Sequence, residues 1–300
     1  MVKKVLVTGA LGFIGNYFLK ELENNLDKED IFILERPEKK LNSLEKKFNV
    51  ISSSLDGGKF LANKIKNIHT VYHLAGNIRT LSKDIKEEHY RINSDLTKSF
   101  LESCKSAGVK RFVFISTSEV YGENLTGSIN EYHKTNPVTD YAKSKFFAEE
   151  CCKEFSEYFI VTVIRLSYIY GFGQPEERLF PKLIKASLEE KIIPFGPVAG
   201  GNDFIYAKDA AKGIFLLGNH NQKNTFEIFN LSSGKSTSFK EIFKTIGELT
   251  GKKYQKMKIS EEKGRFHFDI SKSKEKGFFI EYDLEKGLQE YINFYKDKIS

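Results

Sequence analysis

The stretch KKVLVTGALGFIGNYFLKEL, residues 3–22, places three glycines between an apolar run and an amphipathic segment. The apolar run predicts a strand and the amphipathic segment predicts a helix, so Gly9, Gly12 and Gly15 fall in the turn between them. Gly9 can take a backbone conformation closed to other residues, Gly12 lets a ligand approach the chain, and Gly15 lets the helix lie close to the sheet. The free N–H groups at such a helix start face the pyrophosphate of a dinucleotide, although a tight turn alone would also produce this pattern.

An acidic residue follows the second predicted strand, DIFIL. Glu35 lies about 20 residues beyond Gly15, the spacing at which a carboxylate accepts hydrogen bonds from the adenosine ribose hydroxyls. Arg36 comes next and would instead meet a 2′-phosphate. We therefore expect NAD as the cofactor and leave NADP open.

Short apolar or β-branched runs alternate with helical stretches through the first two-thirds of the chain. The runs are KVLVT, DIFIL, FNVIS, HTVYHLA, RFVFIS and VTVIRL. This alternation predicts an α/β fold with a Rossmann-type doubly wound parallel sheet. After about residue 166 the elements become shorter and richer in proline, which indicates a second lobe. We assign residues 1–165 with 203–230 to a dinucleotide-binding domain, and residues 166–202 with 231–300 to a smaller α/β substrate-binding lobe.

Composition limits the remaining classes of protein. The chain has 300 residues, of which 40% are hydrophobic and 29% charged, enough to bury a large core. Its net charge of +7 comes from lysines scattered among acidic neighbours, so it favours an anionic ligand. We expect no nucleic-acid partner, because no helix-turn-helix, RRM or zinc-finger pattern occurs.

Membrane and metal roles find no support in the sequence either. We expect a cytoplasmic protein without a membrane segment, because no apolar run approaches the roughly 18 residues that span a bilayer and the chain begins with a strand-like segment. Cys104, Cys151 and Cys152 have no metal-ligand spacing to one another or to any histidine, so we expect reduced thiols and no metal.

Several motifs occur in one order along essentially the whole chain. They are TGALGFIG (8–15), VYHLAG (71–76), RINSDLTKSFLESCKSAGVKRFVFISTSEVYG (91–122), YAKSK (141–145), GNDFIYAKDAAKGI (201–214) and FNLSSGKSTSFKEI (229–242). With these motifs the chain resembles the extended short-chain dehydrogenase/reductase family, the NAD-dependent epimerases and dehydratases of nucleotide sugars. The resemblance implies a nucleotide-sugar substrate and a homodimer formed through the helices that hold LTKSFLES and YAKSKFFAEE. The cofactor-binding residues we expect are Gly9, Gly12, Phe13, Ile14, Gly15, Glu35, Arg36, Leu74, Ala75, Gly76, Tyr141 and Lys145.

YAKSK supplies the predicted catalytic pair. Tyr141 and Lys145 lie one helical turn apart on one face, where an ammonium favours the phenolate and so makes Tyr141 a general base. The same spacing recurs at Tyr254 with Lys258 and at Tyr282 with Lys286, which we interpret as solvated surfaces. The resemblance adds Thr117 as the residue that hydrogen-bonds the reacting hydroxyl.

The two residues after Thr117 bear on the reaction. Similar enzymes that only epimerise have unremarkable side chains there, whereas dTDP-glucose dehydratases have Asp-Glu, and GDP-mannose dehydratases and UDP-glucuronate decarboxylases have Ser-Glu. This chain has Ser118 and Glu119. Glu119 is the candidate base for a proton alpha to a C4 ketone and Ser118 a hydrogen-bonding partner of the substrate, although Glu119 would equally bind a sugar hydroxyl or cap a loop.

Three departures from the family pattern concern ligand binding. Asn202 stands where the family's RDF segment supplies an arginine to the diphosphate, so we name Arg178 and Arg265 as replacements, or else a substrate other than a standard nucleotide sugar. RLSYIYG lacks the common Pro-Phe-Asn, and VISSS has serines where an acidic residue usually meets the adenine. We interpret His73 as a residue that packs or hydrogen-bonds beneath the cofactor.

These features together predict an NAD-dependent enzyme that oxidises a sugar hydroxyl, at C4, to a ketone that then undergoes dehydration, decarboxylation or epimerisation. A 4-keto-sugar reductase that uses external NAD(P)H would keep the same three catalytic residues and is the main alternative. A non-catalytic dinucleotide-sensing or RNA-associated protein has no need of these residues and is the weaker alternative.

Overall fold

The structure is a computed structural model that describes residues 3–38, 47–77, 85–189, 201–251 and 265–299. The chain divides into two compact units. The first unit comprises Met1–Glu123, Lys134–Leu166 and Ala211–Phe229, and the second comprises Asn124–His133, Ser167–Ala210 and Asn230–Ser300.

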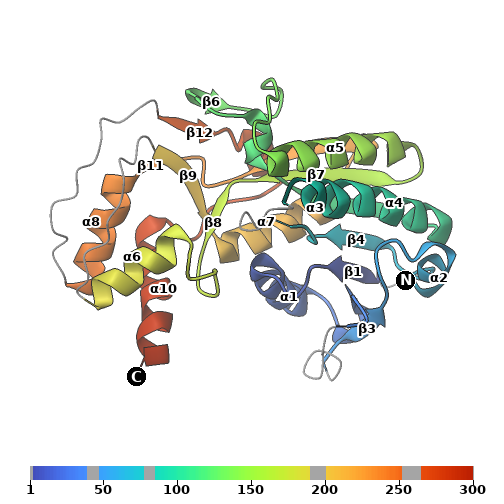
Figure 1. Cartoon of the computed structure of the whole chain (residues 1–300), viewed down its shortest axis with the longest axis horizontal. Helices are drawn as coiled ribbons and strands as arrows, with labels where there is room; N and C mark the ends of the chain where they lie inside the picture. The colour runs from blue at the N-terminus through green and yellow to red at the C-terminus, as the bar shows by residue number, and fades with distance from the viewer. Residues whose placement is uncertain (1–2, 39–46, 78–84, 190–200, 252–264, 300) are drawn as a thin grey trace. The chain divides into compact units, whose positions relative to one another are not determined.

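The first unit is built on a sheet that has seven strands within the described residues (Figure 1). The strands are β1 Val5–Thr8, β2 Ile31–Glu35, β3 Asn49–Ser52, β4 Thr70–His73, β5 Arg111–Thr117, β7 Ile160–Leu166 and β10 Phe226–Leu231. Their order is β10-β7-β5-β4-β1-β2-β3, and the pairs from β7 through β3 are all parallel. Because the strand order reverses at β1, its carboxyl end is the topological switch point where ligands of such sheets bind. The predicted doubly wound α/β sheet is confirmed.

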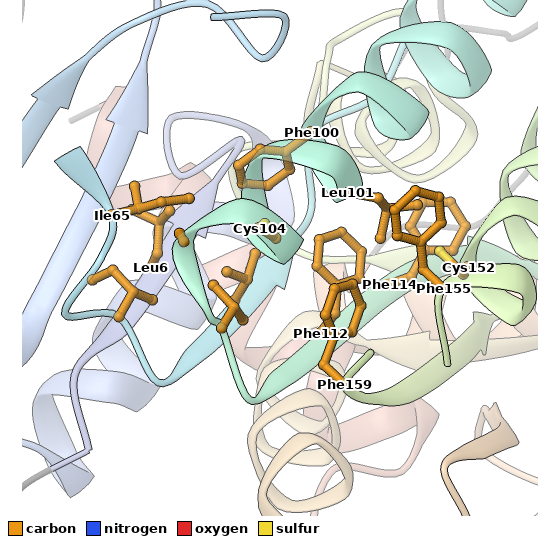
Figure 2. Packing of buried hydrophobic residues seen from close by; sticks show 14 of the residues in the cluster. Leu6, Ile65, Phe100, Leu101, Cys104, Phe112, Phe114, Cys152, Phe155 and Phe159 are labelled. Atoms are coloured by element: carbon orange, nitrogen blue, oxygen red, sulfur yellow. The ribbon is translucent and has the colours of Figure 1, made fainter. Parts of the chain in front are cut away.

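Helices of the first unit cover both faces of this sheet (Figure 1). They are α1 Phe13–Asn25, α2 Gly58–Lys64, α3 Ile85–Tyr90, α4 Leu96–Ala107, α5 Asp140–Glu154 and α7 Ala207–Asn219, with the short turns η1 Lys28–Asp30, η2 Arg91–Asp95, η3 Ser118–Tyr121 and η4 Phe155–Glu157. Alternation along β5 sends successive side chains to opposite faces. Phe112 and Phe114 join the core that α2, α4 and α5 cover, together with Phe100 and Phe159 (Figure 2).

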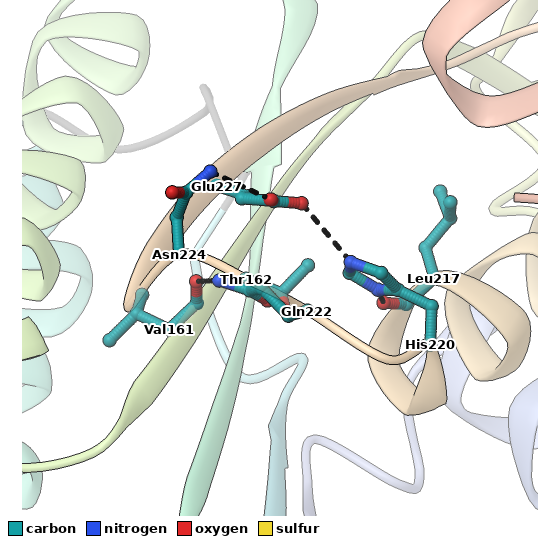
Figure 3. Close-up of polar contacts among 7 residues, drawn as sticks. All are labelled: Val161, Thr162, Leu217, His220, Gln222, Asn224 and Glu227. Carbon is teal, nitrogen blue, oxygen red and sulfur yellow. Dashed lines mark hydrogen bonds and ion pairs between the residues drawn. The ribbon is translucent and has the colours of Figure 1, made fainter. Parts of the chain in front are cut away.

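Helix α7 packs very closely against the opposite face of the sheet. A Cβ on Gly218 would lie 2.4 Å from the Tyr72 ring and 3.0 Å from Val113, so glycine lets the helix approach β4 and β5. Polar contacts connect the end of α7 and the segment after it to strands β7 and β10 (Figure 3). Gln222 binds the Thr162 hydroxyl at 2.8 Å, and both nitrogens of His220 face oxygen atoms, one from Glu227 at 3.1 Å and one from the Leu217 carbonyl at 2.5 Å.

The second unit contains two small sheets and its own core. One sheet has the order β11-β9-β8, and β12 pairs in parallel with β6. The elements are β6 Gly127–Ile129, β8 Tyr168–Tyr170, β9 Gly201–Tyr206, β11 Ser236–Ser238, β12 Phe266–Phe268, α6 Leu179–Leu188, α8 Phe239–Thr250, α9 Ser271–Glu275 and α10 Leu284–Ile299. Aromatic rings dominate its core, where Tyr170 stacks on Phe180 with 4.6 Å between ring centres.

Two segments fall in a different unit from the one the sequence suggested. Residues 124–133 group with the second unit because β6 pairs with β12, and residues 203–210 do so because β9 pairs with β8 and β11. The assignment of the two units to cofactor and substrate stays a prediction. Among the described residues, no helix is long and apolar enough to cross a membrane.

Candidate active site

The turn between β1 and α1 requires glycine at two positions. Gly9 has a φ of +71°, and a Cβ there would lie 2.7 Å from the Ala75 nitrogen. A Cβ on Gly15 would lie only 2.2 Å from the Gly9 carbonyl oxygen, so the first turn of α1 rests on the backbone of the preceding turn. At Gly12 the nearest atom would be 3.1 Å away, a tight but milder contact. The space beside Gly12 is consistent with its expected role of letting a ligand approach.

The start of α1 suits an anion. Its N-cap Gly12 offers no side-chain hydrogen bond, and no acidic residue lies in the first turn, which begins with the half-buried Phe13 and Ile14. N–H groups of a first helical turn have no partner within the helix and carry the positive end of the helix dipole. The turn therefore fits the pyrophosphate of a dinucleotide.

The end of β2 favours NAD over NADP. Glu35 is buried at the carboxyl end of β2, the strand next to β1, whereas Arg36 is exposed. A buried carboxylate here suits two ribose hydroxyls and opposes a 2′-phosphate.

A chain of hydrogen bonds joins β1, β4 and α4 beneath this turn. The Ala75 N–H donates to the Thr8 hydroxyl at 3.2 Å, and Thr8 contacts Nδ1 of His73 at 2.7 Å. Nε2 of His73 lies 3.0 Å from the Thr97 hydroxyl, which donates in turn to the Asn93 carbonyl. Because Thr97 already donates its proton, His73 donates from Nε2 and accepts at Nδ1, which is the neutral imidazole.

Burial and, to a smaller extent, the Lys145 charge lower the pKa of His73 to about 3. His73 is the last residue of β4 and directly precedes Leu74, Ala75 and Gly76, while its position beneath the cofactor stays a prediction. Leu74 hydrogen-bonds the Thr8 carbonyl through its own N–H at 3.2 Å. Among the described residues, no group of three histidine, cysteine or acidic side chains could hold a metal ion.

The Lys145 side chain extends from α5 toward β5 and the segment that follows β4. Its side chain is buried, and its ammonium lies 4.1 Å from the centre of the Phe114 ring and 3.7 Å from the position that a Cβ on Gly76 would take. Burial lowers the pKa of Lys145 to about 8, although Cys152 and Glu149 act in the opposite direction. The ammonium therefore lies close to the predicted cofactor segment at the end of β4.

Tyr141 is held by a buried polar link that the sequence analysis missed. Asn93 lies in the π-helical turn η2, accepts from the Asn77 N–H at 2.7 Å and donates to the Ser144 hydroxyl at 3.0 Å. Ser144 donates to the Tyr141 carbonyl at 2.8 Å. The Tyr141 ring is half-buried, 5.8 Å from the ring centre of His89. Irregular π-helical turns are frequent at functional sites, but sequence pattern did not reveal this one.

Thr117, Ser118 and Glu119 follow one another at the carboxyl end of β5. Thr117 caps the short helix η3 by accepting from the Glu119 N–H at 3.2 Å. Ser118 is buried, and the half-buried Glu119 accepts from the Thr139 hydroxyl at 3.4 Å. Thr139 is the N-cap of α5, so Glu119 lies at the start of the helix that carries Tyr141.

All five predicted catalytic residues belong to the first unit, whereas Arg178, Asn202 and Arg265 belong to the second. Arg178 is exposed at the start of α6, and Arg265 is exposed just before β12. Asn202 is half-buried in β9, opposite Thr237. Their roles in diphosphate binding stay predictions.

A glycine turn for a dinucleotide and a tyrosine-lysine helix at one sheet edge define the class of NAD-dependent oxidoreductases of the short-chain type. The model of the NAD dependent epimerase/dehydratase family matches residues 5–232, and the chain belongs to this family.

Known relatives match over the whole chain. An uncharacterized UDP-glucose epimerase of Bacillus subtilis, YtcB, is 30% identical over 96% of this chain and 95% of its own. A UDP-glucuronate 4-epimerase of Thermodesulfobacterium geofontis is 29% identical over 98% of this chain and 96% of its own. The solved structure of MoeE5 in complex with UDP-glucuronic acid and NAD superposes with a TM-score of 0.82 and 27% identity, covering 98% of this chain and 99% of the other. The predicted family and its NAD cofactor are thus confirmed, and the chain is an enzyme of the epimerase/dehydratase type.

Proposed function

We propose that this enzyme is a 4-epimerase of a UDP-sugar that oxidises the C4 hydroxyl and then restores it with inverted configuration. The observation that carries the proposal is the buried Lys145 ammonium beside Gly76, four residues along α5 from Tyr141. Two relatives that match almost the full chain are named as UDP-sugar epimerases, which favours epimerisation among the reactions of the family.

The residues present fit NAD. Gly9 and Gly15 leave no room for a Cβ, the uncapped start of α1 suits the pyrophosphate, and buried Glu35 suits the adenosine ribose. When bound, NAD supplies a hydride acceptor that can later act as a hydride donor. We assign Lys145 to a cofactor hydroxyl group, and the position of its ammonium beside Gly76, three residues after the end of β4, supports this role.

Tyr141 and Thr117 handle the proton of the substrate. Tyr141, as a phenolate stabilised by the Lys145 ammonium, accepts the C4 hydroxyl proton, while Thr117 holds the same oxygen by a hydrogen bond. The C4 oxygen then belongs to a ketone, whose two faces are both open to reduction once the sugar turns within its site. Tyr141 returns the proton to that oxygen when C4 is reduced, so the product differs from the substrate only in configuration.

The test measures products from UDP-glucose, UDP-galactose and UDP-glucuronate by mass spectrometry and chromatography. A product of unchanged mass and altered retention is expected. Tyr141→Phe should lower turnover on the order of 10²–10⁴-fold, because a positioned general base contributes about that much, while NAD binding persists. Near-normal turnover of this variant would refute the assignment of Tyr141.

Dehydration is the second candidate, favoured by Glu119, which lies two residues after Thr117. Its half-buried carboxylate, just beyond the end of β5, would serve as the base that removes a proton alpha to the C4 ketone. Loss of water from the product, abolished by Glu119→Gln, would identify a dehydratase. If the same variant epimerises at an unchanged rate, Glu119 is not a catalytic base and only accepts the hydrogen bond from the Thr139 hydroxyl. A 4-keto-sugar reductase would instead consume one external NADH for each product formed.

A homodimer through α4 and α5 is part of this proposal. Phe147 on α5 is 51% exposed and touches Tyr90, with 5.8 Å between their ring centres, so the helix presents an aromatic surface. Light scattering should give twice the monomer mass, and Phe147→Glu should reduce it to the mass of one chain. A cytoplasmic location and diphosphate binding by Arg178 and Arg265 remain predictions.

A further inference from the structure

We propose that Glu149 and Arg165 form a positioning pair that holds the catalytic segments together and sets the electrostatic potential at Tyr141 and Lys145. The inference rests on the proposed function, because that function makes Tyr141 the base and Lys145 its ammonium partner. Nothing in the sequence pattern alone had assigned a role to this pair.

The pair is a buried ion pair with two-pronged geometry. Nη2 of Arg165 lies 2.7 Å from Oε2 of Glu149, and Nε lies 3.2 Å from each carboxylate oxygen. Glu149 is 1% exposed and Arg165 is 4% exposed. Burial opposes the charge of Arg165, but Glu149 outweighs it and raises the pKa of the guanidinium. The guanidinium is therefore charged inside the protein, where it forms an ion pair with the Glu149 carboxylate and where charges act over long range.

The pair ties the end of β5 to α5. The Ser116 hydroxyl donates a short hydrogen bond to Glu149, and Ser116 lies directly opposite Arg165 in the β5/β7 register. Ser116 immediately precedes Thr117. A shift of the carboxylate would thus move the backbone that carries the predicted hydroxyl-binding residue.

The pair also reaches the segment that carries Glu119. The guanidinium carbon of Arg165 lies 4.8 Å from the centre of the Tyr121 ring, and Tyr121 is the last residue of η3. A guanidinium over an aromatic face is attracted by the ring and fixes its orientation. One arginine therefore contacts α5 and η3 at once.

The effect of Glu149 on the electrostatic potential at Tyr141 and Lys145 follows from their spacing along α5. Tyr141, Lys145 and Glu149 are four residues apart on α5, so they share one face of the helix. Burial lowers the pKa of Lys145, whereas Cys152 and Glu149 raise it. Burial also raises the pKa of the Cys152 thiol well above its ordinary value, which leaves the thiol neutral and Glu149 as the negative charge.

Two other described groups that face Lys145, from β4 and β5, carry no charge. His73 of β4 is neutral because burial lowers its pKa to about 3, and β5 presents the Phe114 ring. Glu149, with its partner Arg165, thus forms a buried ion pair on the face of α5 that carries Tyr141 and Lys145. Tyr141 also has His89 beside its ring, and Glu119 and Asp140 lie at the start of α5, but these groups are the same in every variant compared. Removing one member of the ion pair changes the local potential, and removing both nearly restores it.

The experiment is a titration of the Tyr141 phenolate by ultraviolet difference absorbance, without substrate or cofactor. Each variant is compared with the same variant carrying Tyr141→Phe, which isolates one tyrosine among the 14 in the chain. Glu149→Gln removes a negative charge and should shift the titration to lower pH by on the order of one unit. Arg165→Met should shift it to higher pH by a similar amount, and the pH profile of kcat/KM should move in the same directions.

Two controls separate this role from a structural one. The double variant Glu149→Leu/Arg165→Met keeps the charge balance and should titrate near the wild type, because apolar replacements of buried ion pairs are tolerated. Ser116→Ala removes a hydrogen bond without changing charge and should lower stability with no shift. Unmoved titrations, or shifts of equal sign in the two single variants, would overturn the inference. If Glu149→Gln does not fold, Arg165→Met carries the same test with the opposite sign.

The two hypotheses fail in different ways. Normal turnover by Tyr141→Phe would reject Tyr141 as the base, whatever the titration shows. A titration that the charge variants do not move, with turnover lost in Tyr141→Phe, would reject only the role of the Glu149 and Arg165 pair.

Discussion

Gly15 is the residue in the cofactor turn that tolerates a side chain least. Gly15→Ala would place its Cβ 2.2 Å from the Gly9 carbonyl oxygen and 2.6 Å from the Ala10 oxygen, both backbone atoms that cannot rotate away. We expect a loss of about 1–3 kcal/mol in the free energy of unfolding and weaker NAD binding. Gly12→Ala is the matched control, since its Cβ would lie 3.1 Å from the nearest atom and its φ of −73° is open to alanine. Urea unfolding compares the stability of the two variants, and equal losses in the free energy of unfolding would contradict the packing argument.

His73 makes stability depend on pH. Burial lowers its folded-state pKa to about 3, below the unfolded value of 6.5, so the unfolded chain binds more protons in this window. Its contribution is fully present above pH 6.5 and is lost as the pH falls toward 3. We expect about 2 kcal/mol of the free energy of unfolding to be lost between pH 6.5 and 5 because of this group alone.

The variant His73→Gln isolates this effect, since glutamine does not titrate and can still donate one hydrogen bond and accept another. It should be less stable than the wild type at pH 7, and the difference should narrow toward pH 5 in urea unfolding. A constant difference across that range would show that His73 does not supply the proton uptake.

At the residue scale, local pattern predicted the turn glycines and the buried Glu35 because each depends on neighbours in sequence. It did not predict Asn93, whose partners Asn77 and Ser144 lie 16 and 51 positions away. It also missed Arg165 as the partner of Glu149, although Glu149 follows Lys145 by one helical turn. Such pairs form only where the fold brings distant segments together, and periodicity carries no information about them.

At the scale of elements, helix α8 begins with a complete capping box. The Ser238 hydroxyl accepts from the Glu241 N–H at 3.2 Å, and the Glu241 carboxylate accepts from the Ser238 N–H at 2.7 Å. These hydrogen bonds lower the pKa of Glu241. Ser238→Ala should cost about 1 kcal/mol in the free energy of unfolding, because it leaves a helical N–H without its acceptor.

A matched control for this cap lies two residues earlier. The Ser236 hydroxyl is buried without a hydrogen-bond partner among the described residues, so Ser236→Ala should be neutral or slightly stabilising. Urea unfolding compares the two variants. A larger loss for Ser236→Ala than for Ser238→Ala would contradict the assignment of the cap.

At the scale of elements, hydrophobic period predicted the strands of the main sheet, whereas the boundary between the units was less predictable. The sequence assigned residues 124–133 to the first part, but β6 pairs with β12, more than 130 residues later in the chain. Parallel pairing of two three-residue strands leaves almost no periodic signal. The unit to which such a short strand belongs depends on the strand it pairs with, and a single sequence does not reveal that pairing.

The whole molecule should unfold in one transition although it contains two cores. Helix α7 and strand β10 each contain residues of both units, so neither unit keeps all its elements if the other unfolds. Phe180 is buried in the core of the second unit and stacks on Tyr170, and Phe180→Ala should cost about 3–5 kcal/mol. We expect this variant to lower the temperature at which the first unit loses NAD, and circular dichroism to show the same midpoint. Tyr132→Ala, at a side chain 90% exposed in the same unit, should leave both midpoints unchanged. Loss of secondary structure in two steps, with NAD still bound after the first, would show that each core unfolds independently.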